Sequence, residues 1–184
     1  MNQKHVVIRA YRQKDYEQIQ CVCLKTAGAG LRRFKKFLLV SFCDYYIETE
    51  PENCFVAADE RDVAVGYVLC SQDTKEWKRI FDESYIKRLP LLFRPIARGS
   101  GAEALKWAEE YPAHLHIDIL SDYQHCGVGV KLMETLIVHL RQKGVTGVQL
   151  SVAKNNIGAQ TFYQKCGFTV LKGNAAALAM GIKL

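Results

Sequence analysis

A short glycine-containing segment between a predicted strand and a predicted helix has the residue types of an anion-binding turn. The β-rich run of residues 113–120 is followed by polar residues, and residues 124–129 read Gln-His-Cys-Gly-Val-Gly directly before a helix-patterned segment. Glycines let the backbone turn tightly and let an anion approach the amides. The first amides of a helix have no partner within it, and the helix dipole is positive there. The chemistry indicated is binding of a phosphate or pyrophosphate.

A single helix N-terminus does not hold such a group firmly, because it contributes only about 0.3–2 kcal/mol to a bound anion. Several converging amides, with Lys131 one turn into the helix, would be needed. The two glycines also have a simpler interpretation, since a strand-to-helix corner can be a tight connection and nothing more. The segment is neither a dinucleotide-binding G-x-G-x-x-G, because Leu132 occupies the last position, nor a G-x-x-x-x-G-K-S/T loop.

A second motif distinguishes between these interpretations. Residues 156–168 read Asn-Ile-Gly-Ala-Gln-Thr-Phe-Tyr-Gln-Lys-Cys-Gly-Phe and follow the first motif after about one strand. In this order and spacing, the two motifs resemble those of the GCN5-related N-acetyltransferase (GNAT) superfamily. The family patterns read Arg/Gln-x-x-Gly-x-Gly/Ala and Asn-x-x-Ala-x-x-(Leu/Phe)-Tyr-x-Lys-x-Gly-Phe. The resemblance covers residues 5–184, with 72–112 as its least typical part.

This resemblance implies an acetyl-CoA-dependent N-acetyltransferase that moves an acetyl group directly from the CoA thioester to a primary amine. Weaker cues in residues 67–74 and 112–120 resemble one branch of the superfamily, related to the acetyltransferase-like domain of O-GlcNAcase. The implied partner is an amine on a small molecule or a peptide. Amino sugars, polyamines, antibiotics, amino acids, protein N-termini and lysines all stay open as acceptors.

The resemblance also implies which residues hold the cofactor. The backbone of Ile117 and Ile119 would lie beside the pantetheine and acetyl groups, with the Ile117 amide as the oxyanion donor. Asn156 would contact the cofactor from the other arm of the site. The residues expected around its pyrophosphate are Gln124, His125, Cys126, Gly127, Val128, Gly129 and Lys131.

Tyr163 matches the family position that protonates the departing thiolate. A thiol of pKa about 8.5 is already a fair leaving group, so this acid would be helpful rather than obligatory. The alternative is a tyrosine that packs under the cofactor and only positions it.

A base for the amine has three candidates, because His114, His116 and Asp118 alternate on one face of the predicted strand. Histidine titrates where an amine base must work, so Asp118 and His116 could form a proton relay. Two alternatives stay open: a buried hydrogen-bonded pair of His116 and Asp118, or side chains that face solvent. Water could also accept the proton.

Aligned on Gln124, the positions where many relatives keep a base correspond to Ala113 and Leu115. Both would lie on the opposite face of the strand and neither can take a proton. This departure motivates a second function of another class, a non-catalytic module that binds or senses acyl-CoA.

The elements that must position these residues alternate between strands and helices. Strands are predicted over residues 5–10, 54–58, 63–70, 113–120, 148–152, 168–171 and 176–182. Helices are predicted over residues 15–24, 31–47, 103–111, 127–144 and 157–166, with an amphipathic helical pair at 73–95 and a chain break at 98–101. We therefore expect an α/β fold: a mixed central sheet of about six or seven strands, antiparallel in its N-terminal half, flanked by helices, with a helical insertion at about 73–110.

The composition fits one ordinary globular domain spanning residues 1–184, with 49% hydrophobic and 24% charged residues. No apolar run approaches the ~18 residues of a membrane helix, and the start contains no signal-peptide pattern, so we expect a cytoplasmic protein without membrane contact. Seven cysteines cannot all pair within one chain, and no second closely spaced Cys or His pair accompanies Cys21 and Cys23. No metal site is predicted.

The formal net charge of +6 has no single interpretation, because composition cannot separate nucleic acid, an anionic cofactor or neither. We expect part of it to serve the CoA phosphates near Lys131 and expect no nucleic-acid partner. The apolar segment 175–180 could be core or the interface of a homodimer.

Overall fold

Seven strands form one sheet in the computed structural model, which describes residues 5–184 except for the side chain of residue 100. In spatial order the strands are β1 (Val7–Ala10), β2 (Cys54–Ala58), β3 (Ala64–Ser71), β4 (Ala113–Ile119), β5 (Gly147–Ala153), β7 (Ala177–Lys183) and β6 (Thr169–Gly173). β4 and β5 run parallel, whereas every other neighbouring pair among the described strands is antiparallel. The predicted mixed sheet with an antiparallel N-terminal half is confirmed.

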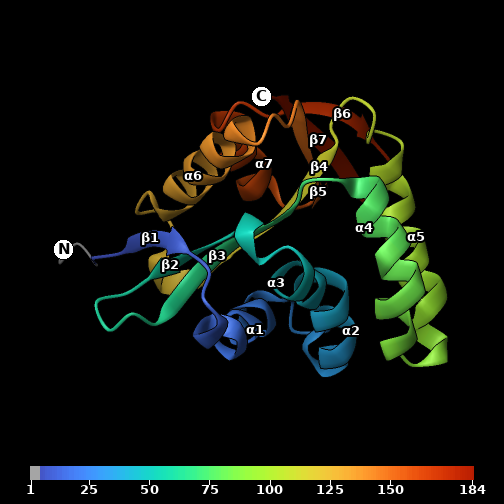
Figure 1. The fold of residues 1–184 in the computed structure, drawn as a ribbon, viewed down its shortest axis with the longest axis horizontal. Coiled ribbons are helices and arrows are strands. Elements are labelled where there is room, and N and C mark those ends of the chain that lie inside the picture. Colours follow the sequence, from blue (N-terminus) through green and yellow to red (C-terminus); the bar gives the residue numbers. More distant parts are fainter. Residues whose placement is uncertain (1–4) are drawn as a thin grey trace.

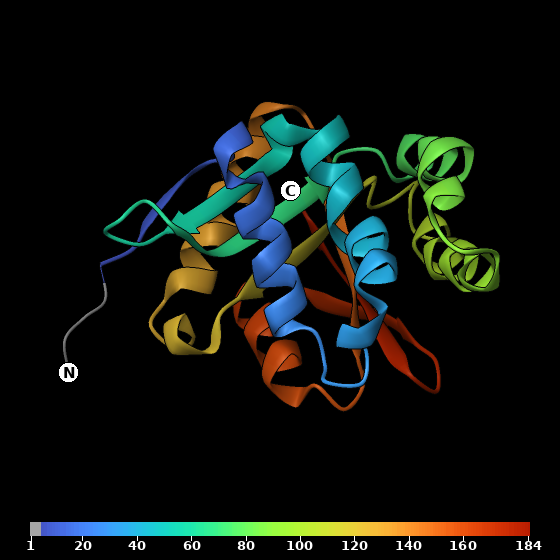
Figure 2. The same ribbon diagram turned by 90° about the horizontal axis from the view of Figure 1, so that it is seen from below.

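Helices cover both faces of this sheet (Figures 1 and 2). One face carries α1 (Tyr16–Thr26), α2 (Lys35–Leu39) and α3 (Tyr45–Thr49), packed on buried side chains such as Tyr46 and Tyr67. The other carries α6 (Val128–Gln142) and α7 (Ile157–Lys165), packed on residues such as Leu132 and Met180. Within the described residues, no helix combines the length and apolarity needed to cross a membrane.

The helix-like stretch predicted over residues 31–47 is helical along its length, but it is not one regular α-helix. A 3₁₀ turn at Arg32–Phe34 precedes α2, and a π-helical turn at Val40–Asp44 separates α2 from α3. The apolar run here is nearly continuous and has no 3.6-residue period. The wider turn buries four of its five residues, Val40, Ser41, Cys43 and Asp44, which one stripe of a regular helix could not do.

The insertion consists of two helices that lie beside the main body, α4 (Thr74–Ile80) and α5 (Arg94–Leu105) (Figure 1). The predicted break at 98–101 is wrong because α5 runs through it, and the helix predicted over 103–111 ends at Leu105. A Cβ on Gly101 would lie 2.7 Å from the Trp77 ring of α4. The glycine therefore permits close packing of the two helices and does not interrupt α5.

β4 and β5 separate soon after they meet. They pair only at Ala113 with Val148 and His114 with Gln149, although both strands continue for several residues. The edge of β4 that faces β5 is thus unpaired beyond His114.

A buried ion pair joins β1 to the start of α1. The fully buried carboxylate of Asp15 accepts from Arg9 Nη1 at 2.6 Å, Arg9 Nη2 at 2.8 Å and the Arg12 amide at 2.8 Å. Burial alone would raise the pKa of Asp15, but these hydrogen bonds outweigh it and lower the pKa. Arg9 also donates to Asp62 at 2.7 Å, in the exposed β2–β3 turn.

We predict that Asp15→Asn lowers the free energy of unfolding by about 3 kcal/mol, because it leaves the Arg9 charge without its buried partner. Since the folded-state pKa of Asp15 is lowered, its contribution is present above the unfolded pKa of about 3.9 and is lost as the pH falls through the folded value. Urea denaturation at several pH values measures both effects. Asp62→Asn is the control and should destabilise far less, so an equal loss would contradict this account.

Candidate active site

The open edge of β4 presents free backbone groups. The Leu120 amide donates to Val65 O at 2.9 Å. The backbone N–H and C=O groups of the even-numbered residues of β4 therefore bond to β3, and those of the odd-numbered residues point toward β5. Gln124 Nε2 donates to Ile119 O at 2.8 Å. In the described part of the chain, no acceptor meets the amides of Ile117 and Ile119. These are the two strand residues that the sequence predicts beside the cofactor.

A second set of free amides lies where α6 begins. His125 and Gly127 both have positive φ, +60° and +82°, and such alternation folds successive amides into an anion-binding concavity. The first amide of α6 to find an acceptor is that of Lys131, which donates to Gly127 O at 3.1 Å. No acceptor among the described residues meets the amides of residues 125–130. Free amides on both segments fit an extended polar chain that ends in a pyrophosphate, as in acetyl-CoA.

The two glycines of this loop are required for different reasons. A Cβ on Gly127 would meet nothing within 4 Å, but its φ of +82° disfavours any other residue. Gly129 has ordinary backbone angles, and a Cβ there would lie 3.1 Å from the Phe162 ring and 3.3 Å from the Ile119 side chain. Val128 turns its side chain into the core, so only its backbone faces the loop.

The remaining predicted cofactor residues differ in their exposure and in their hydrogen bonds. His125 and Lys131 are exposed. Cys126 is exposed and donates to Tyr123 O at 2.9 Å. Asn156 caps α7, because its Oδ1 accepts from the Ala159 amide at 3.1 Å. This cap is a structural role that the motif did not reveal, and the contact of Asn156 with a cofactor stays a prediction.

Tyr163 lies in α7 with 9% of its surface exposed. Its ring packs against Phe162 and Phe168, with centroids 5.2 and 5.8 Å apart. Its hydroxyl has no hydrogen-bond partner among the described residues. Burial, with a smaller effect of the Asp118 charge, raises the pKa of this hydroxyl. Tyr163 therefore keeps its proton at neutral pH and has it free to donate.

His114 is a structural residue. Thr74 Oγ1 donates to Pro112 O at 2.7 Å, so it accepts from His114 Nδ1 at 2.9 Å. His114 Nε2 is then the acceptor for the Tyr46 hydroxyl at 2.8 Å. Burial lowers the pKa of His114 to about 3, which leaves a neutral ring with both nitrogens occupied.

The alternative of a His116–Asp118 hydrogen bond is not what the structure contains. His116 packs edge-on against the rings of Phe42 and Tyr46, at 5.2 and 5.3 Å, and no hydrogen bond is found for it in the described part of the chain. Burial lowers the pKa of His116 to about 4. Asp118 Oδ2 accepts instead from the Tyr67 hydroxyl at 2.5 Å.

Asp118 is a half-buried carboxylate. Burial raises its pKa to about 6, and the Tyr67 hydrogen bond opposes that rise. At pH 7 the group is therefore mostly ionised, and it has a higher proton affinity than His116, because burial raises the pKa of Asp118 and lowers that of His116. Of the two candidate bases on β4, the chemistry favours Asp118.

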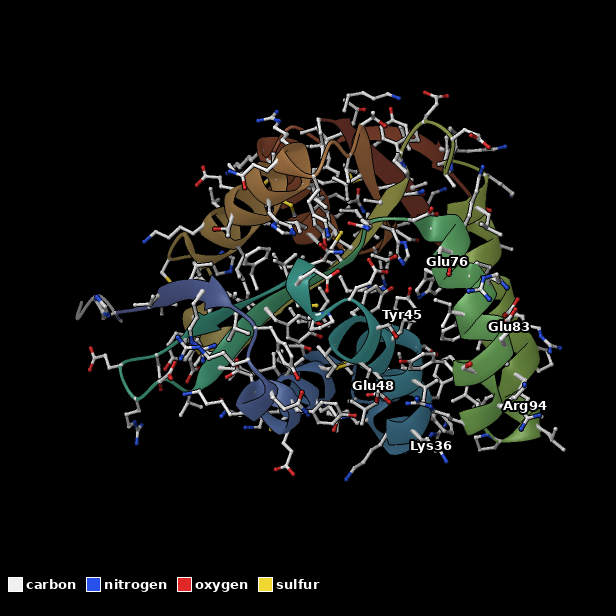
Figure 3. The ribbon with its side chains drawn as sticks, in the orientation of Figure 1. Lys36, Tyr45, Glu48, Glu76, Glu83 and Arg94 are labelled. Atoms are coloured by element: carbon white, nitrogen blue, oxygen red, sulfur yellow. The ribbon has the colours of Figure 1, made fainter. Side chains whose placement is uncertain are left out.

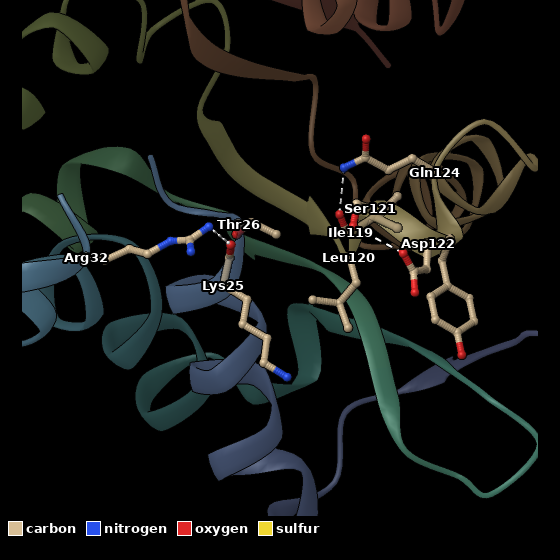
Figure 4. Close-up of a pocket in the computed structure, with 9 residues that line it drawn as sticks. Lys25, Thr26, Arg32, Ile119, Leu120, Ser121, Asp122 and Gln124 are labelled. Carbon is tan, nitrogen blue, oxygen red and sulfur yellow. Dashed lines mark hydrogen bonds between the residues drawn. The ribbon is translucent and has the colours of Figure 1, made fainter. Parts of the chain in front are cut away.

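A cleft of about 430 Å³ lies at the end of β4 (Figure 4). Residues 119–124 line one side of it, and Lys25, Thr26 and Arg32 line the other. Two hydrogen bonds hold the Arg32 side chain: Nη2 donates to Lys25 O at 2.7 Å and Nε to Ala27 O at 2.9 Å. Sequence reasoning assigned no role to these three residues or to Tyr67. The sequence shows nothing more on this side of the cleft than two glycines, within the segment Thr-Ala-Gly-Ala-Gly of residues 26–30.

Comparisons with known proteins agree with this geometry. The sequence model of the acetyltransferase (GNAT) family matches residues 30–168. The crystal structure of SsHAT superposes with a TM-score of 0.87 at 30% identity, covering 97% of this chain and 98% of that one. PaiA N-acetyltransferase from Thermoplasma acidophilum, solved in complex with coenzyme A, shares the fold with a TM-score of 0.64 at 14% identity, covering 98% and 99% of the two chains.

A shorter similarity is to the [ribosomal protein bS18]-alanine N-acetyltransferase of Haemophilus influenzae. The two sequences are 43% identical over 53 residues, which is 29% of this chain. The match spans 36% of the length of that curated relative.

We predict that Gly127→Ala weakens acetyl-CoA binding about tenfold. The substituted loop relaxes from positive φ, and restoring it on binding costs about 1–2 kcal/mol. Isothermal titration calorimetry measures the change in Kd. The matched control is Gly144→Ala at the other end of α6, where φ is +73° and a Cβ also meets nothing within 4 Å. The control should lose stability and keep its affinity. If both variants bound acetyl-CoA equally weakly, the positive φ of Gly127 would have no specific role in binding the cofactor.

Proposed function

The chain belongs to the acetyltransferase (GNAT) family, and from this premise we propose that it transfers an acetyl group from acetyl-CoA directly to a primary amine. The predicted superfamily and enzyme class, an N-acetyltransferase, are confirmed. The narrower branch, related to O-GlcNAcase, stays a prediction. The observation that carries the proposal is the run of free amides along β4 and at the start of α6.

Each set of amides has its own task. Acetyl-CoA supplies an activated acyl carbon and a thiol leaving group, in agreement with the coenzyme A bound by the Thermoplasma relative. The amides of residues 125–130, with Lys131, bind its phosphates. The Ile117 amide donates to the acyl oxygen, where negative charge develops during transfer.

Two side chains transfer protons, one as the general base and one as the general acid. Asp118 accepts the proton of the attacking amine, since its pKa of about 6 leaves it ionised yet basic at neutral pH. Tyr163 donates the proton of its otherwise free hydroxyl to the leaving thiolate. His116 packs against the rings of Phe42 and Tyr46 and takes no part in proton transfer.

The polypeptide N-terminus is one acceptor class, because a protein-bound alanine is the acceptor named for the Haemophilus relative. A homodimer and a cytoplasmic location are retained as proposals. The alternative of a non-catalytic acyl-CoA module rested on Ala113 and Leu115, which the structure buries in the core under α6. Asp118 on the other face can take the role that those two residues cannot.

The direct test combines calorimetry with acetyl-CoA and CoA release across a panel of amines. We expect saturable binding and turnover with at least one amine. For Tyr163→Phe we predict a fall in kcat of about tenfold, because a thiolate leaves slowly but measurably without an acid. Its Kd for acetyl-CoA should be unchanged. Absence of binding at millimolar acetyl-CoA would exclude the proposed function, and an unaltered kcat would leave Tyr163 only a positioning role.

A pH–rate profile of kcat/KM tests Asp118. We predict that the rate rises with pH through about 6, because the ionised carboxylate is the active form. Tyr67→Phe removes a hydrogen bond that favours the ionised form, so the rise should move to higher pH. Asp118→Asn should abolish the rise and most of the rate. A profile that Tyr67→Phe does not shift would exclude Asp118 as the titrating base.

A further inference from the structure

Two segments far apart in the sequence hold nine of the 25 basic residues and none of the 19 acidic ones. They are residues 25–43 and 84–102. The rest of the chain contains 16 basic and 19 acidic residues and is therefore slightly negative. The whole excess of positive charge thus belongs to these two segments, which we call the basic surface.

Aromatic packing brings the two segments together. Phe93, at the start of the second segment's helix, packs against Phe34 and Phe37 of the first, with ring centroids 5.2 and 5.5 Å apart. Figure 3 shows Lys36 on α2 and Arg94 on the insertion at the same end of the molecule. One continuous surface results from parts that are about 60 residues apart.

Eight of the nine basic side chains on this surface have no carboxylate partner among the described residues, and Arg88 is the exception. Arg88 pairs with Glu48 at 2.8 Å. Among the described side chains, no carboxylate pairs with the other eight, Lys25, Arg32, Arg33, Lys35, Lys36, Lys87, Arg94 and Arg98. Elsewhere, ion pairs hold Arg9, Lys75, Lys78 and Arg79. Unpaired charge of one sign attracts a ligand of the opposite sign.

The same surface carries three exposed aliphatic side chains, and two of them, Leu91 and Leu92, are the most exposed large apolar side chains of the described chain. Leu91, Leu92 and Ile96 are 76%, 80% and 59% exposed. Its aromatic rings, in contrast, pack on one another. Sequence-tolerant nucleic-acid sites present aromatic rings to the bases, whereas exposed aliphatic side chains suit the apolar side chains of a peptide.

The basic surface reaches the cleft, because Lys25 and Arg32 line both. We propose that the acetyl acceptor is the amine of an acidic polypeptide segment, which the basic surface holds while the amine enters the cleft beside β4. This inference rests on the proposed function. Carboxylates of the segment pair with the eight cations that have no carboxylate partner, and its apolar residues contact Leu91, Leu92 and Ile96.

This arrangement also favours the reactive form of the amine. Positive charge near a bound amine disfavours its protonated form, so Lys25 and Arg32 raise the neutral fraction that can attack. The same charges repel polyamines, which carry several cations and no compensating anion. The basic surface thus disfavours polyamines as acceptors and favours acidic polypeptides.

The experiment compares two peptides with the same N-terminal alanine amine. One continues with glutamates and leucines, and the other has arginine in place of each glutamate. Acetylation is followed by CoA release and mass spectrometry, and binding by fluorescence anisotropy without acetyl-CoA. We expect the acidic peptide to have a kcat/KM at least about tenfold higher at low ionic strength, with the preference fading as salt is added.

Charge reversal locates the interaction. The variant Lys36→Glu/Arg98→Glu should remove the preference and the binding of the acidic peptide. The control is Arg61→Glu/Arg141→Glu, two exposed arginines outside the basic surface, and it should keep both. The two variants carry the same net charge, so a general electrostatic effect would move them equally and would overturn the inference.

Other outcomes are also decisive. A preference for the arginine peptide or for spermidine, or no binding of either peptide, would overturn the inference. So would stronger binding of a short single-stranded RNA or of phosphatidylserine vesicles that depends on Lys36 and Arg98. Binding of the acidic peptide without acetylation of any amine would support the docking surface and refute the proposed function, so the two failures are distinguishable.

Discussion

β4 and β5 pair at only two positions and then separate, and the site depends on this separation because paired strands would satisfy the same amides internally. The Ile117 and Ile119 amides are free only since β5 no longer lies beside them. A short loop connects β4 to α6, and Gln124 of that loop donates back to Ile119 O, so the free amides before α6 follow those of β4 along the chain. Backbone N–H groups that have no acceptor within the protein need one from outside it when they are taken out of water. A ligand with an extended polar chain supplies such acceptors.

The two faces of β4 carry different kinds of side chains. Odd-numbered residues pack under α6 and α7 in the apolar core, with Tyr163 beside them. Even-numbered residues lie toward α1 and α3, where burial lowers the pKa of both histidines and raises that of Asp118. One low-polarity environment thus produces two neutral imidazoles and a carboxylate that titrates near physiological pH. The basic surface lies on the side of α2 and the insertion and faces the acceptor.

The sequence predicted the fold and the glycine-containing turn before α6, because their signals are local, whereas the binding of a cofactor by that turn stays a prediction. Strand periodicity, the strand–glycine–helix order at residues 124–129 and the spacing to Tyr163 are each contained in one short segment. The partners of Asp118 and His114 were not predictable, since Tyr67, Tyr46 and Thr74 reach them only through tertiary packing and the register of β3. The break expected at 98–101 failed because Gly101 accommodates Trp77, a contact between two helices. The basic surface also depends on tertiary structure, since Phe93 joins its two segments.

Amide hydrogen exchange with and without acetyl-CoA tests the central claim most directly, because it reports on the backbone groups themselves. The account predicts that the cofactor slows exchange at residues 125–130 and at Ile117 and Ile119, while the amides of β3 and β7 are unchanged. Protection confined to other segments, or no protection at these amides despite saturating cofactor, would contradict it.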